Sequence, residues 1–113
     1  MQHELRVQDI VVGEGKEVKK GALINAHYRG WLEDGSEFDS SYKKGEPFTC
    51  VLSNKRVIQG WVMGLQGMKV GGKRQLWVPA HLAYGERKIG TMIPANSNLN
   101  FEIELLEVMN RED

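Results

Sequence analysis

Residues 99–105 read LNFEIEL, an unbroken alternation of apolar and polar side chains. In an extended chain successive side chains point to opposite faces, so a period of two separates an apolar face from a polar one. The apolar face consists of Leu99, Phe101, Ile103 and Leu105. We therefore expect a strand over residues 99–108, with this face covering the core and the opposite face in water.

Other segments of the chain are also rich in Val, Ile, Leu and aromatic residues and predict strands. These segments are residues 5–12, 23–32, 48–52 and 74–79. Between the second and third of them, Asp34-Gly35 supplies residues that tolerate positive φ, which predicts a tight reversal before Glu37-Phe38. Strands therefore dominate the expected fold.

One helix is expected after Ser53-Asn54. Ile58, Trp61, Val62 and Leu65 follow the i, i+3, i+4, i+7 spacing that places apolar groups on one helical face. Two glycines, Gly60 and Gly64, interrupt this segment, and each costs a helix about 1 kcal/mol relative to alanine. The helix is expected to need support from packing against the sheet. The predicted fold class is α+β, with an antiparallel sheet wrapped around one short helix.

The composition is typical of one soluble globular domain. The chain has 113 residues, 41% of them hydrophobic and 27% charged, and no repeat or linker divides it, so we expect a single domain over residues 1–113. Fifteen basic and fifteen acidic residues cancel, so we expect neither nucleic acid nor a membrane surface as a partner. No basic segment with an apolar core opens the chain, and no apolar run approaches the roughly 20 residues of a membrane span. The expected location is the cytoplasm.

Several motifs that would indicate other chemistry are incomplete. Residues 67–73 match half of a phosphate-binding loop, but Arg74 replaces the required Ser or Thr, which favours a simple turn. The three histidines, His3, His27 and His81, are widely spaced, so no metal site or other cofactor is expected. The single Cys50 has no nearby base and is expected to be a buried, inert thiol.

Aromatic side chains from separate segments are the more informative feature. A curved sheet would bring them together, and composition alone leaves open whether they form a plain core or the wall of a binding pocket. They are Tyr28, Phe38, Phe48, Trp61, Tyr84 and Phe101.

Four segments of the chain resemble signature segments of the FKBP-type peptidyl-prolyl cis-trans isomerases, in the same order and spacing. They are residues 27–30 (HYRG), 32–41 (LEDGSEFDSS), 57–61 (VIQGW) and 83–85 (AYG). Pro47-Phe48, Ile93-Pro94 and residues 99–106 extend the resemblance over about 11–108, which is the expected core of the domain. The resemblance implies a five- or six-stranded antiparallel half-barrel around one short helix, with a shallow apolar pocket between them.

The resemblance also implies roles for individual residues. Trp61 forms the pocket floor, and its walls come from Tyr28, Phe48, Val57, Ile58, Ile93 and Phe101. Phe38 and Asp39 lie beside the reacting bond, where Asp39 either polarises the substrate or hydrogen-bonds a Tyr or Arg neighbour. The Ile58 N–H and the Tyr84 hydroxyl hydrogen-bond substrate carbonyls on the two sides of the proline.

The implied activity is acceleration of Xaa-Pro bond rotation during protein folding, by a non-covalent apolar pocket that stabilises the twisted amide. The alternatives are a non-catalytic binding module for proline-containing segments and a purely structural protein. The implied partners are proline-containing peptides or proteins and the macrolides tacrolimus and rapamycin, and the expected state is a monomer. Within the loop of residues 85–94, Ile89 and Met92 depart from the common family pattern. In the same loop, Arg87 and Lys88 either form a solvated loop tip or favour substrates with acidic residues near the proline.

Overall fold

The computed structural model describes residues 4–111, and His3, one of the histidines considered above, lies outside them. Six strands form one sheet. They are β1 (Arg6–Val11), β2 (Leu23–Leu32), β3 (Glu37–Ser40), β4 (Phe48–Val51), β5 (Lys73–Val78) and β6 (Leu99–Met109). Helix α2 (Gln59–Gly64) lies against the sheet, and α1 (Ser41–Lys44) and the 3₁₀ turn η1 (Ala80–Leu82) connect strands.

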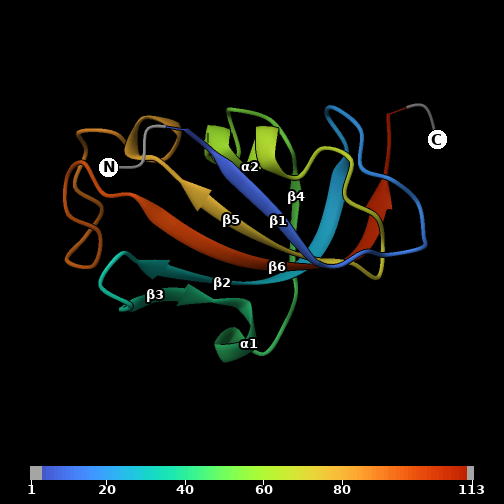
Figure 1. Ribbon diagram of the computed structural model, residues 1–113, viewed down its shortest axis with the longest axis horizontal. Helices are drawn as coiled ribbons and strands as arrows, with labels where there is room; N and C mark the ends of the chain where they lie inside the picture. Colours follow the sequence, from blue (N-terminus) through green and yellow to red (C-terminus); the bar gives the residue numbers. More distant parts are fainter. Residues whose placement is uncertain (1–3, 112–113) are drawn as a thin grey trace.

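Every strand pairing is antiparallel, in the order β1-β5-β6-β2-β3. Strand β4 pairs with the first half of β2, from Leu23 to Ala26, so β3 and β4 share one edge of that long strand. The strands curve across the molecule with α2 over one face (Figure 1). The predicted α+β class, with an antiparallel sheet and one short helix against it, is confirmed.

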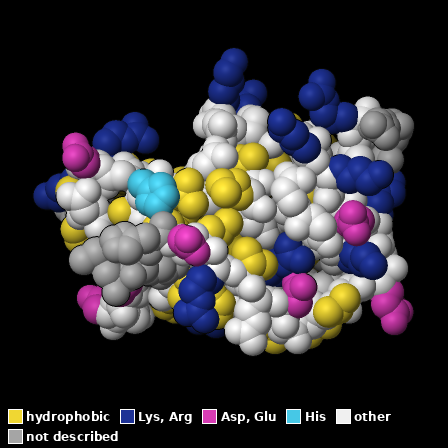
Figure 2. All heavy atoms as spheres, turned by 45° about the horizontal axis from the view of Figure 1, so that its top comes forward, with side chains coloured by type: hydrophobic (Ala, Val, Ile, Leu, Met, Phe, Trp, Pro, Cys, Tyr) yellow, Lys and Arg dark blue, Asp and Glu magenta, His cyan; other side chains and the backbone are white. Residues whose placement is uncertain are grey.

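The alternation in β6 separates core from solvent as predicted. Leu99 and Ile103 are fully buried, and Phe101 and Leu105 nearly so, while the side chains between them are partly exposed. Basic and acidic side chains are both spread over the face drawn in Figure 2, in line with the zero net charge.

Helix α2 depends on its two glycines for contact with the sheet. A Cβ atom on Gly60 would lie 2.4 Å from Val78 Cγ1, and one on Gly64 would lie 2.9 Å from a methyl carbon of Leu76. The glycines lower helix propensity but allow the helix backbone to touch β5 directly. The helix is shorter than the apolar spacing indicates, because Ile58 and Leu65 are its capping residues.

Arg74 is a buried charge within β5 that fastens three elements together. Its Nε donates to Asp9 Oδ1 of β1 at 2.7 Å, and its Nη1 donates to the carbonyl oxygens of Gly64 and Gln66 at 2.9 Å each. Those carbonyls belong to the end of α2, where backbone acceptors lack intrahelical partners. The guanidinium therefore satisfies the helix end and holds it to the sheet.

The short elements α1 and η1 escaped the sequence interpretation. Helix α1 is capped at its start by Ser40, whose side chain accepts from the Lys43 N–H, and at its end by Gly45 with φ of 80°. Such single-turn elements are set by capping and have no apolar period.

Residues 67–73 form a turn into β5, as predicted, with Gly71 at φ of 90°.

Cys50 is a buried free thiol on β4, and burial raises its pKa to about 11. The thiol therefore stays protonated at neutral pH, in agreement with the expectation of an inert core cysteine.

Among residues 4–111, no helix has the length and apolar character that crossing a membrane requires. The same residues contain no group of three metal-ligating side chains.

Candidate functional site

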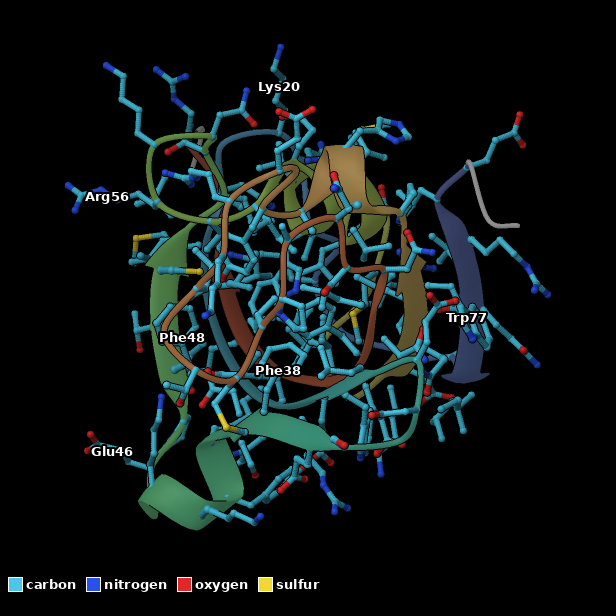
Figure 3. All side chains as sticks on the ribbon, turned by 90° about the vertical axis from the view of Figure 1, so that its left-hand side faces the viewer. Lys20, Phe38, Glu46, Phe48, Arg56 and Trp77 are labelled. Atoms are coloured by element: carbon cyan, nitrogen blue, oxygen red, sulfur yellow. The ribbon has the colours of Figure 1, made fainter. Side chains whose placement is uncertain are left out.

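A cavity of about 270 Å³ opens between α2 and the inner face of the sheet. Residues from β2, β3, α1, β4, α2, β6 and the loops before α2 and after η1 meet there. The lining consists of Tyr28, Phe38, Asp39, Lys44, Phe48, Arg56, Val57, Ile58, Trp61, Tyr84 and Phe101. The fold therefore gathers at one place aromatic residues that lie far apart in the sequence. Figure 3 labels three of the lining residues, with Phe38 near the middle of the view and Phe48 and Arg56 toward its left-hand edge.

Trp61 is the centre of the aromatic lining and is only 4% exposed. Its ring meets those of Tyr28, Phe48 and Phe101 edge to face, with centroids 5.3, 6.1 and 5.5 Å away. Edge-to-face contacts fix ring orientation as well as position. The cavity floor is therefore rigid and continuous with the hydrophobic core.

Gly30 on β2 allows Phe38 to reach this cluster. A Cβ atom there would lie 2.6 Å from Phe38 Cζ and 3.0 Å from Phe101 Cε1. The Phe38 and Phe101 rings meet edge to face with centroids 5.7 Å apart. The absence of a side chain at residue 30 is thus what permits the two rings to pack over β2.

The indole of Trp61 carries an unsatisfied polar atom. Its buried Nε1–H has no hydrogen-bond partner among the described residues. A buried donor without an acceptor costs about 1–3 kcal/mol and is uncommon in native proteins. Trp61, which forms the cavity floor, therefore carries a polar group that lowers the stability of the folded protein.

Asp39 lies at the cavity rim in a network with Tyr28 and Lys44. The Tyr28 hydroxyl donates to Asp39 Oδ2 at 2.5 Å, and the Lys44 ammonium lies 3.1 Å from Asp39 Oδ1. The Ser40 N–H also donates to Oδ1, at 2.9 Å. The carboxylate therefore hydrogen-bonds a tyrosine, which was one of the two roles left open by the sequence.

The network sets the protonation states at the rim. Burial and the hydrogen bond to Asp39 raise the pKa of Tyr28 to about 12. Burial also raises the pKa of Asp39, but hydrogen bonds from Tyr28 and Lys44 outweigh it and hold that pKa below its ordinary value. Burial, followed by the Asp39 charge, raises the pKa of Tyr84. At neutral pH the site therefore presents an ionised Asp39 and two tyrosines that remain hydrogen-bond donors.

Two donors at the cavity have no acceptor within residues 4–111. The Ile58 N–H makes no backbone hydrogen bond, although the Ile58 carbonyl accepts from Trp61 and Val62. The Tyr84 hydroxyl likewise has no hydrogen-bond partner in the described part of the chain. Both are free to bind a peptide carbonyl.

Most of the predicted site residues line the cavity, but one does not. Ile93 is 5% exposed and belongs to the core beneath the loop, where it exchanges backbone hydrogen bonds with Ile89. Lys44 and Arg56 line the cavity and were not predicted as site residues. The signal for Lys44 was its place five residues after Asp39, which becomes meaningful only when α1 turns the chain back.

Comparison with known proteins gives a consistent result. Residues 14–106 match the family model described as FKBP-type peptidyl-prolyl cis-trans isomerase. A curated relative, the FK506-binding protein of Neisseria meningitidis serogroup A, is 48% identical over 104 residues, which cover 92% of this chain and 95% of the relative.

Solved structures agree with the fold. The crystal structure of AtFKBP13 superposes with a TM-score of 0.83 and 45% identity, covering 93% of each chain. That of FkpA from Escherichia coli gives a TM-score of 0.85 and 43% identity over 92% of this chain, which corresponds to 47% of that longer chain.

Proposed function

The chain belongs to the family of FKBP-type peptidyl-prolyl cis-trans isomerases and is such an isomerase, and from this premise we propose how its cavity acts. The apolar cavity takes up the proline ring of an Xaa-Pro segment and favours the twisted amide over the planar one. The single observation that carries this proposal is the floor of Trp61 surrounded edge to face by Tyr28, Phe48 and Phe101.

The size of the cavity suits one ring-bearing residue. Its volume of about 270 Å³ lies just below the range of about 300–1,000 Å³ that is usual for sites of drug-sized ligands. A proline ring with its adjoining amide fits such a space, while the rest of the peptide stays outside. The site therefore accepts proline within many sequences.

The chemistry requires no covalent intermediate. Rotation about the peptide bond meets a barrier of about 18–20 kcal/mol because the bond has partial double-bond character. A gain of about 10⁴-fold corresponds to about 5.5 kcal/mol of preferential transition-state binding. The planar amide is the more polar and better hydrated form, so it loses more than the twisted form when water is excluded.

Two free donors orient the substrate in this mechanism. The Ile58 N–H and the Tyr84 hydroxyl each take one peptide carbonyl, so the segment is held on both sides of the proline while the bond between them turns. Asp39 acts through Tyr28, whose ring forms one wall and whose hydroxyl it holds. Phe38 closes the wall beside the reacting bond.

We also propose that the protein binds macrolides, is a monomer and is located in the cytoplasm. Tacrolimus and rapamycin occupy the same cavity, because each can place an apolar ring on Trp61, and several relatives are named FK506-binding proteins. The protein acts as a monomer in the cytoplasm on proline-containing segments of other proteins. Light scattering tests the monomer, cell fractionation tests the location, and competition between tacrolimus and a substrate peptide tests the shared cavity.

The central experiment follows cis-to-trans relaxation of a short Xaa-Pro peptide with the wild-type protein, Trp61→Ala and Asp39→Ala. Circular dichroism of each variant serves as the folding control. The wild type should accelerate relaxation, and both variants should lose most of the acceleration. If a folded wild type gives no acceleration, the cavity serves binding alone, as a module for proline-containing partner segments. If folded Trp61→Ala retains full activity, the apolar floor is not the catalytic element.

A further inference from the structure

A second cleft adjoins the cavity and shares part of its wall. Its volume is about 330 Å³, and its lining differs from that of the cavity in being rich in cations. The lining consists of Asn54, Lys55, Arg56, Val57, Ile58, Gln59, Ala83, Tyr84 and Arg87. Four residues line both spaces, namely Arg56, Val57, Ile58 and Tyr84, so the cleft lies directly beside the cavity.

The charge of this cleft is one-sided in a protein of zero net charge. Lys55, Arg56 and Arg87 line it, and its lining contains no Asp or Glu. All three side chains are exposed, and within residues 4–111 none of them forms a salt bridge. By contrast, Lys44, which lines the cavity but not the cleft, is already paired with Asp39. Three uncompensated positive charges therefore face one small space.

Local structure explains how the cations gather. A turn at residues 53–57, closed by hydrogen bonds from the Arg56 and Val57 N–H groups to the Ser53 carbonyl, presents Lys55 and Arg56. Arg87 comes from the loop after η1, and its N–H donates to the Tyr84 carbonyl at 3.1 Å. Arg87 and Tyr84 line the same cleft, and the Arg87 charge lowers the pKa of Tyr84 against the larger effects of burial and of Asp39.

We propose that this basic cleft, lined by Lys55, Arg56 and Arg87, binds an acidic side chain of the substrate near the proline, so that the enzyme prefers prolines with a Glu or Asp neighbour. The proposal rests on the isomerase mechanism above and adds the substrate class. Guanidinium and ammonium groups recognise carboxylates by charge-assisted hydrogen bonds. Because the side chains are exposed, the preference is moderate and depends on salt.

The test measures kcat/KM for peptide pairs that differ only in Glu against Gln, placed immediately before or immediately after the proline. For the wild type we expect a Glu/Gln ratio of about 3 to 10 at one of these positions at an ionic strength of about 0.01 M, and a ratio near one at about 1 M. A parallel calorimetric titration should show tighter binding of the same Glu peptide.

Variants separate the cleft from general electrostatics. Lys55→Gln/Arg87→Gln removes two charges from the cleft and should bring the Glu/Gln ratio toward one. The matched control, Arg6→Gln/Lys69→Gln, removes two charges from β1 and from the turn before β5, and should leave the ratio at its wild-type value. Arg6 stacks over Trp77, which lies across the molecule from Arg56 (Figure 3).

The outcomes are distinguishable from failure of the isomerase mechanism. Acceleration of the Gln peptides with a Glu/Gln ratio near one at both positions would overturn the cleft proposal while leaving the mechanism intact. A ratio lowered equally by the control variant would assign the preference to net charge and would also overturn it. Absence of acceleration with every peptide would contradict the mechanism itself.

Discussion

The cavity and the basic cleft share a wall but are built in opposite ways. The cavity is built around the buried rings of Tyr28, Trp61 and Phe101, which meet edge to face, and its cation Lys44 is paired with Asp39. The cleft adds exposed side chains from two connecting segments, among them three cations that have no acidic partner within the described residues.

This difference separates catalysis from selection. Cavity residues such as Trp61 and Phe101 are also core residues, so a change there affects stability and rate together. Cleft residues contact water, and substitutions of exposed side chains usually change stability little. The chain can therefore alter which prolines it prefers without disturbing how it turns them.

The largest expected effect tests the support of the cavity floor. Gly60→Ala places a Cβ atom 2.4 Å from Val78 Cγ1 and should lower the free energy of unfolding by about 1–3 kcal/mol, although alanine is the better helix former. Chemical denaturation measures this. Met63→Ala, at an exposed position of α2, is the control and should change stability much less. An equally stable Gly60→Ala would mean that α2 can lift from β5 without cost.

A double-mutant cycle tests whether Asp39 acts through Tyr28. Asp39→Asn and Tyr28→Phe each weaken the 2.5 Å hydrogen bond, and each should lower kcat/KM about tenfold, or about 1.4 kcal/mol. The double variant should lose little more than either single variant. Glu37→Gln is the control, because Glu37 pairs with Arg29 and does not line the cavity. Additive losses would give Asp39 a role independent of Tyr28.

Removing the free hydroxyl of Tyr84 should have a smaller effect. Tyr84→Phe deletes one hydrogen bond to substrate, worth about 0.5–1.5 kcal/mol, so kcat/KM should fall about two- to tenfold while the unfolding midpoint stays the same. Tyr42→Phe serves as the control, since the Tyr42 hydroxyl donates to Glu104 at 3.1 Å and does not line the cavity. Unchanged kinetics for Tyr84→Phe would remove this residue from substrate binding.

The isomerase rate should not depend on pH near neutrality, because the mechanism uses no group that titrates there. Hydrogen bonds hold the pKa of Asp39 below its ordinary value, and the pKa of Tyr28 is raised to about 12, so the rate should be constant from about pH 5 to pH 8. Because the pKa of Asp39 is lowered by folding, its contribution to stability is complete above the unfolded value and disappears as pH falls through the folded one. Unfolding curves measured against pH should show this acid loss, and Asp39→Asn should lose less stability at acid pH than the wild type, because Asp34 and Glu37 also have lowered pKa values and remain.

The smallest expected effect belongs to the cleft. Lys55→Gln/Arg87→Gln should change the free energy of unfolding by less than about 0.5 kcal/mol, since neither side chain has an ion-pair partner within residues 4–111. Thermal and urea unfolding give this value. A clear loss of stability would show that the cleft supports the cavity, and the two regions would no longer be separate.

The sequence was a reliable guide wherever periodicity or order along the chain carried the information. The alternation over residues 99–105 predicted the buried face of β6, and the spacing from Ile58 predicted an apolar helix face that includes Trp61. The order of the family segments predicted the half-barrel and its helix. Single-turn elements such as α1 gave no such signal, because a turn is fixed by its caps alone.

The sequence by itself determined the main strands, helix α2, the family and the set of aromatic residues, because side-chain periods and linear motifs are properties of the chain. Only the tertiary structure decided which of these residues face one another. It placed Ile93 in the core beneath the loop, set Lys44 against Asp39, and joined Lys55 and Arg56 to the distant Arg87 in one cleft. The physical reason is that contacts between remote segments depend on strand register and on how closely α2 approaches β5, and no local pattern records either.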